Sequence, residues 1–90
     1  MSIEINIPPF MQHLAGGVRT AEVEGKTVAE CLEALADRYP QLKPRLLGPR
    51  GELSRGLNLF INGESAPPGE MSRPVEDGDS IHIAYVMVGG

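Results

Sequence analysis

The sequence contains few aromatic residues and almost no sulfur nucleophile: it has no tryptophan, two Phe, two Tyr and one cysteine. Aliphatic side chains must therefore fill the core, and an exposed aromatic ring is conspicuous. The single cysteine, Cys31, cannot form an intramolecular disulfide, in keeping with a reducing compartment. With 90 residues, of which 41% are hydrophobic, the chain is expected to form one globular domain.

Long apolar runs and an excess of basic residues are also missing. No apolar stretch approaches the roughly 18 residues of a membrane span, and the N-terminus lacks the basic region and apolar stretch of a signal peptide. We therefore expect a cytoplasmic protein that does not enter a membrane. The formal net charge of -4 argues against nucleic acid, whose phosphates need a basic footprint, and favours a basic protein partner.

Residue patterns typical of catalysis or metal binding are absent. Cys31 falls in the apolar stripe of a predicted helix, where a thiol usually packs as an inert hydrophobe. His13 and His82 are far apart and have no partners at metal-ligand spacing. The acidic pair at residues 77–79 is explained by turn chemistry, and the glycine-rich stretches lack the Gly-Lys-Ser/Thr ending of a P-loop. We predict no metal site, no bound cofactor and no enzymatic activity of the chain's own.

Alternation of apolar and polar residues predicts the strands. Isoleucines at every second position from Ile3 to Ile7 indicate a first strand that Pro8-Pro9 ends, and a loop containing His13 then leads to a second strand over residues 18–23. Three later strands are expected over residues 57–61, around residues 65–66 and over residues 81–86. The dipeptide Asn62-Gly63 favours a type I′ turn between the first two of these, and residues 77–79 form a turn before the last strand.

One main helix is predicted between the second and third strands. Thr27 followed by Glu30 is a capping box, which satisfies backbone donors at a helix start. An apolar stripe at helical spacing follows, and Pro40 ends the helix; the stripe consists of Val28, Cys31, Leu32, Leu35 and Tyr39. Residues 41–56 are expected to be irregular, with one short helical turn around Leu46-Leu47.

The element order β-β-α-β-(β)-β predicts an α+β fold. A helix with one apolar face can bury it across a mixed four- to five-stranded sheet, as in the ubiquitin-like β-grasp roll. A right-handed crossover would place the last strand beside the first at the sheet centre. We expect a domain over residues 1–86 and a flexible C-terminal tail over residues 87–90.

Strand parity separates a core face from an open face. The helix-facing residues are predicted to be Ile3, Ile5, Ile7, Leu57, Leu59, Ile61, Ile81, Ile83 and Tyr85. The opposite face then carries Glu4, Asn6, Asn58, Phe60, His82, Ala84 and Val86. On this open face Phe60, Ala84 and Val86 form a candidate partner-binding patch that leads toward the tail.

The sequence ends in two glycines, Gly89 and Gly90. At the average glycine usage of about 7%, two terminal glycines arise by chance in roughly 0.5% of chains. Glycine has no Cβ and tolerates both signs of φ, so a terminal Gly-Gly fits through a narrow tunnel into another protein's active site. The Gly90 carboxylate is therefore the candidate reactive group.

These features together resemble the ThiS/MoaD family of ubiquitin-like sulfur carriers: the capped helix, Asn62-Gly63, the turn at residues 77–79 and Gly89-Gly90. Ile7-Pro8 leading to Gly16-Gly17, the helix ending near Pro40 and Arg45, and the run over residues 57–62 are most similar to the CysO-like, cysteine-forming branch. One departure is the approach to the diglycine: many members use proline and alanine there, whereas this chain has Tyr85, Val86, Met87 and Val88.

The resemblance implies two protein partners and no catalytic side chain in this chain. A ubiquitin-activating-like adenylating enzyme would use ATP to convert the Gly90 carboxylate to an acyl-adenylate, and sulfur transfer would give a thiocarboxylate that a sulfur-accepting synthase consumes. Val86 and Met87 would anchor the tail, and Val88 would be the last side chain that the partner accommodates, before Gly89.

Three classes of function remain open from the sequence. The first is a sulfur carrier for cysteine, molybdopterin or thiamin biosynthesis. The second is a ubiquitin-like protein modifier that is conjugated to a lysine through Gly90. The third is a small non-catalytic binding subunit for which the tail is incidental.

Overall fold

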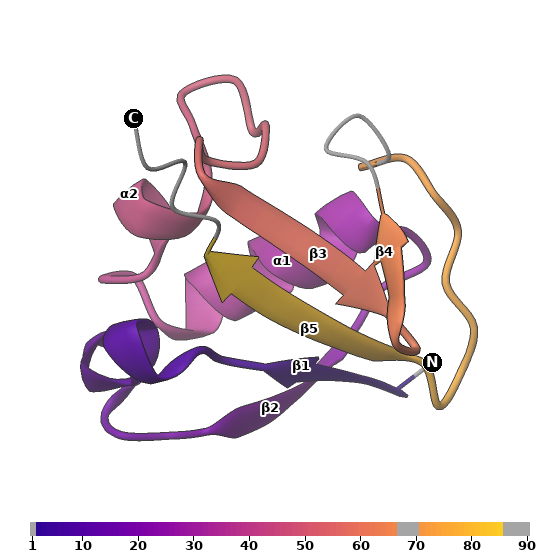
Figure 1. The fold of residues 1–90 in the computed structure, drawn as a ribbon, viewed down its shortest axis with the longest axis horizontal. Helices are drawn as coiled ribbons and strands as arrows, with labels where there is room; N and C mark the ends of the chain where they lie inside the picture. The colour runs from indigo at the N-terminus through magenta and orange to yellow at the C-terminus, as the bar shows by residue number, and fades with distance from the viewer. Residues whose placement is uncertain (1, 67–70, 86–90) are drawn as a thin grey trace.

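The computed structural model describes residues 2–66 and 71–85 of the chain (Figure 1). The elements, in chain order, are strand β1 (Ser2–Asn6), 3₁₀-helix η1 (Pro9–Ala15), strand β2 (Thr20–Glu24), helix α1 (Val28–Arg38), helix α2 (Lys43–Leu46), strand β3 (Leu57–Ile61), strand β4 (Glu64–Ala66) and strand β5 (Ser80–Tyr85). The predicted boundary between residues 86 and 87, and Val86 at the end of the predicted last strand, lie outside the described residues.

The five strands form one mixed sheet in the order β2-β1-β5-β3-β4. β5 lies at the centre and runs parallel to β1, with Ile5 opposite Ile81, and antiparallel to β3, with Leu59 opposite Ile83. The other two pairs, β1 with β2 and β3 with β4, are antiparallel hairpins. The predicted β-grasp fold, with the last strand beside the first, is confirmed.

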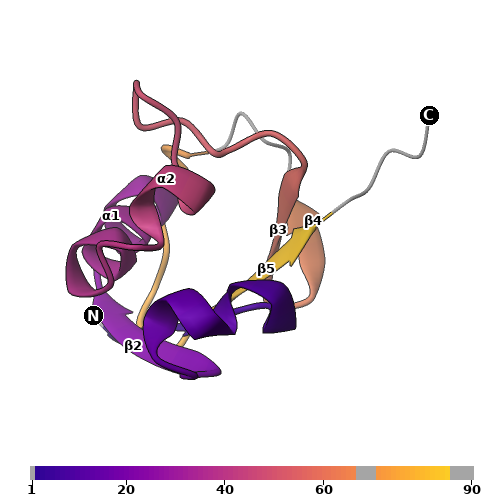
Figure 2. The same cartoon turned by 90° about the vertical axis from the view of Figure 1, so that its left-hand side faces the viewer.

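Within residues 2–66 and 71–85, the helices lie on one side of the sheet and no helix covers the opposite face, which is the open face. Figure 2 shows α1 and α2 together on the same side of the strands. The buried residues between the layers are aliphatic apart from Met11 and Cys31, and none of the four aromatic residues belongs to this core.

Helix α1 begins at the capping box that the sequence predicts. The Thr27 hydroxyl accepts a hydrogen bond from the Glu30 backbone N–H at 3.2 Å. The Glu30 carboxylate accepts in turn from the backbone N–H of Lys26 at 3.0 Å, one residue before the cap. Four residues of the predicted stripe are buried, whereas Tyr39 at its end is only partly buried.

The predicted loop containing His13 is wrong, because residues 9–15 form η1. Pro9 fits the first turn of a helix, where its missing N–H costs nothing. The side chains of Met11 and Ala15 on η1 are buried in the core. This apolar burial stabilises a helical segment whose composition is typical of a loop. Gly16, with φ of 65°, ends η1 in the left-handed conformation, and the second strand starts two residues later than predicted, at Thr20.

The turn after β3 has the predicted conformation. Asn62 and Gly63 have φ of 53° and 85°, as a type I′ turn requires at both central positions. This turn fixes the β3–β4 register, with Ile61 opposite Glu64.

Candidate functional site

The predicted reactive end of the chain lies outside the described residues. Met87, Val88, Gly89 and Gly90 of the tail, together with Val86 of the predicted patch, belong to residues 86–90. The site that the structure describes is the surface around Tyr85, the last residue of β5. Two surfaces meet there: the open face of the sheet, and the end of the molecule where β5 terminates.

On the open face, strand parity places Phe60 and Ala84 as predicted. Both side chains are half-buried and lie outside the core, while their neighbours Leu59 and Ile83 are buried. Phe60 lies opposite His82, and Ala84 lies opposite Asn58. Ala84 is therefore the diagonal cross-strand neighbour of Phe60, within reach of an aromatic side chain.

A row of residues on this face crosses all five strands. Pairwise register places them in the order Thr20, Asn6, His82, Phe60 and Ser65. The β1–β2 half of the row is polar and internally bonded: Asn6 Nδ2 donates to Ser80 Oγ at 3.1 Å, and Thr20 Oγ1 donates to Asn6 Oδ1 at 3.4 Å. The apolar part of the open face is confined to the β3–β5 half, beside the end of β5.

The structure corrects the placement of Tyr85, which the alternation assigned to the core. Its side chain is 53% exposed. Strand parity predicts on which side of the sheet a side chain lies, but it does not predict how far the covering helices extend along the strand. Tyr85 is the last residue of β5, and its side chain is not covered there. Its ring packs edge-on against Phe10 of η1, with ring centroids 5.3 Å apart and an interplanar angle of 66°.

Gly56 also leaves room for the Tyr85 ring. Its φ of 83° disfavours any side chain, and a Cβ there would lie 3.0 Å from Tyr85 Cε2. Three segments distant in sequence, namely η1, the turn before β3 and the end of β5, thus meet around one aromatic side chain.

Sequence reasoning missed Phe10 as a site residue. It is 49% exposed, and with Tyr85 it makes up the large hydrophobic residues that are exposed within residues 2–66 and 71–85. The scarcity of aromatic residues is the one sequence signal that singles out Phe10. Because Phe10 falls in a predicted loop, however, the sequence gives no reason to pair it with the last strand.

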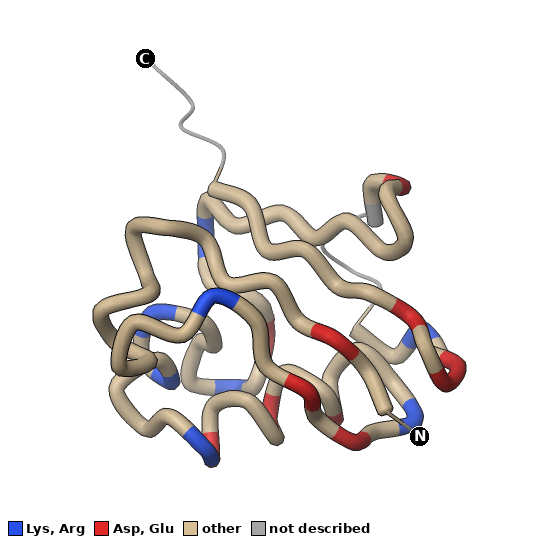
Figure 3. The backbone as a smooth tube through the Cα atoms, turned by 90° about the horizontal axis from the view of Figure 1, so that it is seen from below, with Lys and Arg blue, Asp and Glu red and all other residues tan. Residues whose placement is uncertain are grey.

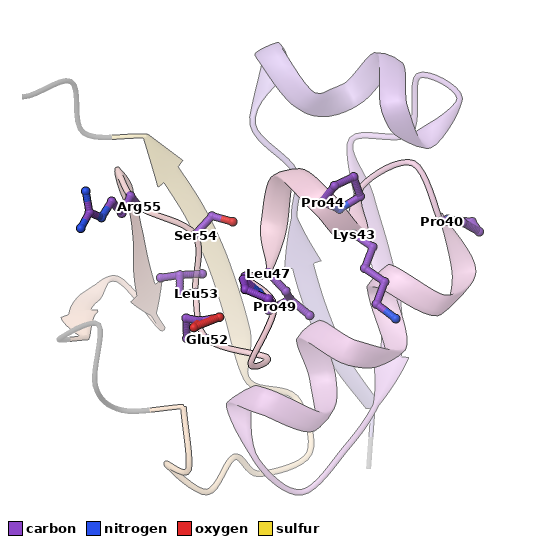
Figure 4. Close-up of a pocket in the computed structure, with 10 residues that line it drawn as sticks. Pro40, Lys43, Pro44, Leu47, Pro49, Glu52, Leu53, Ser54 and Arg55 are labelled. Carbon is purple, nitrogen blue, oxygen red and sulfur yellow. The ribbon is translucent and has the colours of Figure 1, made fainter.

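Two grooves lie near the end of β5. One, of about 650 Å³, lies beside the Phe10–Tyr85 pair and is also lined by Pro9, Arg19 and Ala84. The other, of about 750 Å³, lies between α2 and the segment 48–55 (Figure 4). Leu47 and Leu53 contribute apolar side chains to this second groove, and Arg55 marks its edge nearest the end of β5.

The cysteine and the two histidines considered in the sequence analysis do not lie together as a reactive cluster. Cys31 is fully buried, and burial, with a smaller contribution from the Glu30 carboxylate, raises the pKa of its thiol. His13 and His82 are both exposed, one on η1 and the other on the open face of β5. Within residues 2–66 and 71–85, no group of three or more His, Cys, Asp or Glu side chains could hold a metal ion.

Of the helices within residues 2–66 and 71–85, none has the length and the apolar character needed to cross a membrane.

Comparison with known proteins gives one family and closely similar structures. The model of the ThiS family matches residues 7–90. Small archaeal modifier protein 1 of Haloferax volcanii is 35% identical over 77 residues, which cover 82% of this chain and 85% of that protein. A chain in the crystal structure of the Amycolatopsis orientalis BexX/CysO complex superposes with a TM-score of 0.85 at 29% identity, covering 98% of this chain and 99% of that one. Mycobacterium tuberculosis CysO, described as an antigen, gives a TM-score of 0.83 at 26% identity, covering 94% and 99%.

Proposed function

This chain belongs to the ThiS family of ubiquitin-like carriers and modifiers, and from that membership we propose that it is a sulfur carrier whose C-terminal Gly90 carboxylate is activated by adenylation. The observation that carries the proposal is the family match over residues 7–90, which includes Gly89 and Gly90. The geometry is compatible with it: β5, the central strand, ends at Tyr85, next to Ala84 of the Phe60–Ala84 surface.

The chemistry requires a separate adenylating enzyme, because a carboxylate is a poor acyl donor. A Gly90 carboxylate oxygen attacks the α-phosphorus of ATP, the bond to pyrophosphate breaks, and an acyl-adenylate forms. A hydrosulfide-equivalent nucleophile then attacks the acyl carbon and AMP leaves. The product is a C-terminal thiocarboxylate, which delivers its sulfur to an acceptor bound in a synthase.

The domain contributes position rather than a catalytic side chain. Cys31 is buried beneath α1, and burial raises the pKa of its thiol, so it is unsuited to nucleophilic attack. β5 pairs with β1 over residues 80–82 and with β3 over residues 81–85, so a partner that grips the domain gains a fixed starting point for the reacting end. ATP is bound by the partner, and this chain supplies the acyl group.

A second candidate function is conjugation to protein lysines through Gly90. It is favoured by the 35% identity to a protein named as a modifier. Activation begins with the same acyl-adenylate, and the outcomes diverge when a lysine amine rather than sulfur attacks the acyl carbon.

Mass spectrometry separates the two functions. The purified chain is incubated with ATP, a sulfide source and the adenylating enzyme encoded in the same genome. A carrier gains about 16 Da, the difference between sulfur and oxygen, and the gain maps to the C-terminal peptide. A modifier instead gives isopeptide-linked lysine adducts, and a chain that acquires neither change is not activated at Gly90.

A further inference from the structure

The charged residues carried by the strands and by the residues next to them differ between the two ends of β5, although Lys26 lies at the acidic end and Glu52 lines a groove with Arg55 at the other. At the end where β5 begins, the sheet and its turns carry the acidic residues Glu4, Glu22, Glu24, Glu64, Glu76, Asp77 and Asp79. At the other end, where β5 terminates, Arg19 precedes β2 and Arg55 precedes β3, and both are exposed. Figure 3 shows basic residues just below the point where the chain leaves β5, and acidic residues, together with some basic ones, near the N-terminus.

The basic end also carries the exposed aromatic pair. Arg19 lines the groove beside Phe10 and Tyr85, while Arg55 is adjacent to Gly56, which the Tyr85 ring approaches. Exposed aromatic rings framed by arginine have the composition of an interface centre, where Tyr and Arg are enriched and Lys, Glu and Asp are depleted. We call Phe10, Arg19, Arg55 and Tyr85 the end surface.

A groove along α2 adjoins the end surface at Arg55. Leu47 and Leu53 lie in that groove, with Arg55 at its edge (Figure 4). Arg55 therefore links this groove, which it lines, to its neighbour Gly56, which the Tyr85 ring approaches.

We propose that the end surface docks on a face of the adenylating enzyme that is acidic at its rim and apolar at its centre. The inference rests on the proposed function, and it reverses the expectation of a basic partner drawn from the net charge of -4. The partner that handles the chain's end meets arginines, although the protein as a whole is acidic.

The distance between the two ends decides which charges the partner meets. The six residues of β5 separate them by about 17 Å at the rise of an extended strand. The screening length at physiological ionic strength is about 8 Å. The acidic end is therefore largely screened from a partner bound at the basic end, whereas Arg19 and Arg55 lie within that length of such a partner.

Two double variants with equal changes in net charge test the proposal. Arg19→Glu with Arg55→Glu reverses the end surface. Lys26→Glu with Arg38→Glu makes the same change in exposed residues on the acidic side, where Lys26 bonds Val75 through the backbone and Arg38 lines a hollow with Glu22 and Glu24. ATP-pyrophosphate exchange with the purified adenylating enzyme of the same genome is measured for both variants and wild type, over a range of salt concentrations.

We expect the end-surface variant to raise the KM for the carrier about tenfold with kcat unchanged, because rim charges act on encounter and affinity. Rising salt should weaken wild-type binding but not that of this variant, and the acidic-side variant should match wild type. Equal KM values for all three proteins would overturn the proposal while leaving the proposed function intact. Equal effects of the two variants would assign the change to net charge and would also overturn it. Absence of exchange with wild type would instead contradict the proposed function, and melting temperatures verify that both variants fold.

Discussion

The Asn62 side chain donates a hydrogen bond from Nδ2 to Asp79 Oδ1 at 2.9 Å, joining two turns that are 17 residues apart in sequence. Asn62 Oδ1 also accepts from the Ser80 backbone N–H at 2.9 Å, and Asp79 Oδ2 accepts from the Glu76 backbone N–H at 2.8 Å. The turn that follows β3 is thereby fixed to the start of β5, at the end of the sheet remote from the end surface.

These bonds make stability depend on pH through Asp79. The hydrogen bond from the Glu76 backbone, with a smaller contribution from Asn62, lowers the pKa of Asp79 below its ordinary value of 3.8. Because the folded pKa is below the unfolded one, the stabilisation is present above about pH 4 and is lost as pH falls through the folded pKa. Urea unfolding gives the free energy of unfolding of wild type and of Asp79→Asn. The difference between the two should be constant from neutral pH to about pH 5 and should shrink in more acidic solution. A difference that persists undiminished in strong acid would show that the carboxylate charge does not matter.

The local elements could be predicted from the sequence because their signals are local. Thr27 and Glu30 are three residues apart and cap the helix as expected, and Asn62-Gly63 alone specifies its turn. Contacts between such segments could not be predicted. Nothing near Tyr85 in the sequence shows that η1 supplies Phe10 as its neighbour, and turn chemistry at residues 77–79 does not identify Asn62 as the partner of Asp79.

Phe60→Ala should weaken binding to the adenylating enzyme far more than it lowers stability. Phe60 is half-buried outside the core, whereas an aromatic residue at an interface centre contributes about 2 kcal/mol or more, equivalent to roughly 30-fold in affinity. Titration calorimetry and thermal melting measure the two effects.

Leu59→Ala is the matched control for Phe60, since Leu59 precedes it on the same strand and is buried. It should lower the free energy of unfolding by about 2–5 kcal/mol. A Phe60→Ala protein that loses as much stability as this control, with affinity unchanged, would remove the open face from the recognition surface.

The Phe10–Tyr85 ring contact should give a measurable coupling energy. Edge-on aromatic pairs contribute about 0.5–1.5 kcal/mol beyond their buried area, and the half-exposed rings here favour the lower part of that range. A double-mutant cycle of Phe10→Ala and Tyr85→Ala, followed by urea unfolding, measures it, and Tyr85→Phe should retain it. Strict additivity of the two alanine substitutions would mean that the rings touch without stabilising the fold.

Cys31→Ala should retain sulfur acquisition and lose about 1 kcal/mol of stability, because it removes one buried atom from the core beneath α1. Burial raises the pKa of the thiol, so a thiol reagent should react slowly with the native protein and rapidly in denaturant. If the Cys31→Ala protein folds but cannot acquire sulfur, the Cys31 thiol carries the sulfur and the Gly90 carboxylate does not.

The account depends most directly on the chemistry of the Gly90 carboxylate, which ATP-pyrophosphate exchange with the cognate adenylating enzyme measures. Wild type should support exchange, whereas a chain extended by one alanine after Gly90 and a chain lacking Gly90 should not, with all three melting at the same temperature. Exchange by the extended chain at the wild-type rate would contradict activation at Gly90, and with it the assignment of this protein as a carrier that reacts through its terminal diglycine.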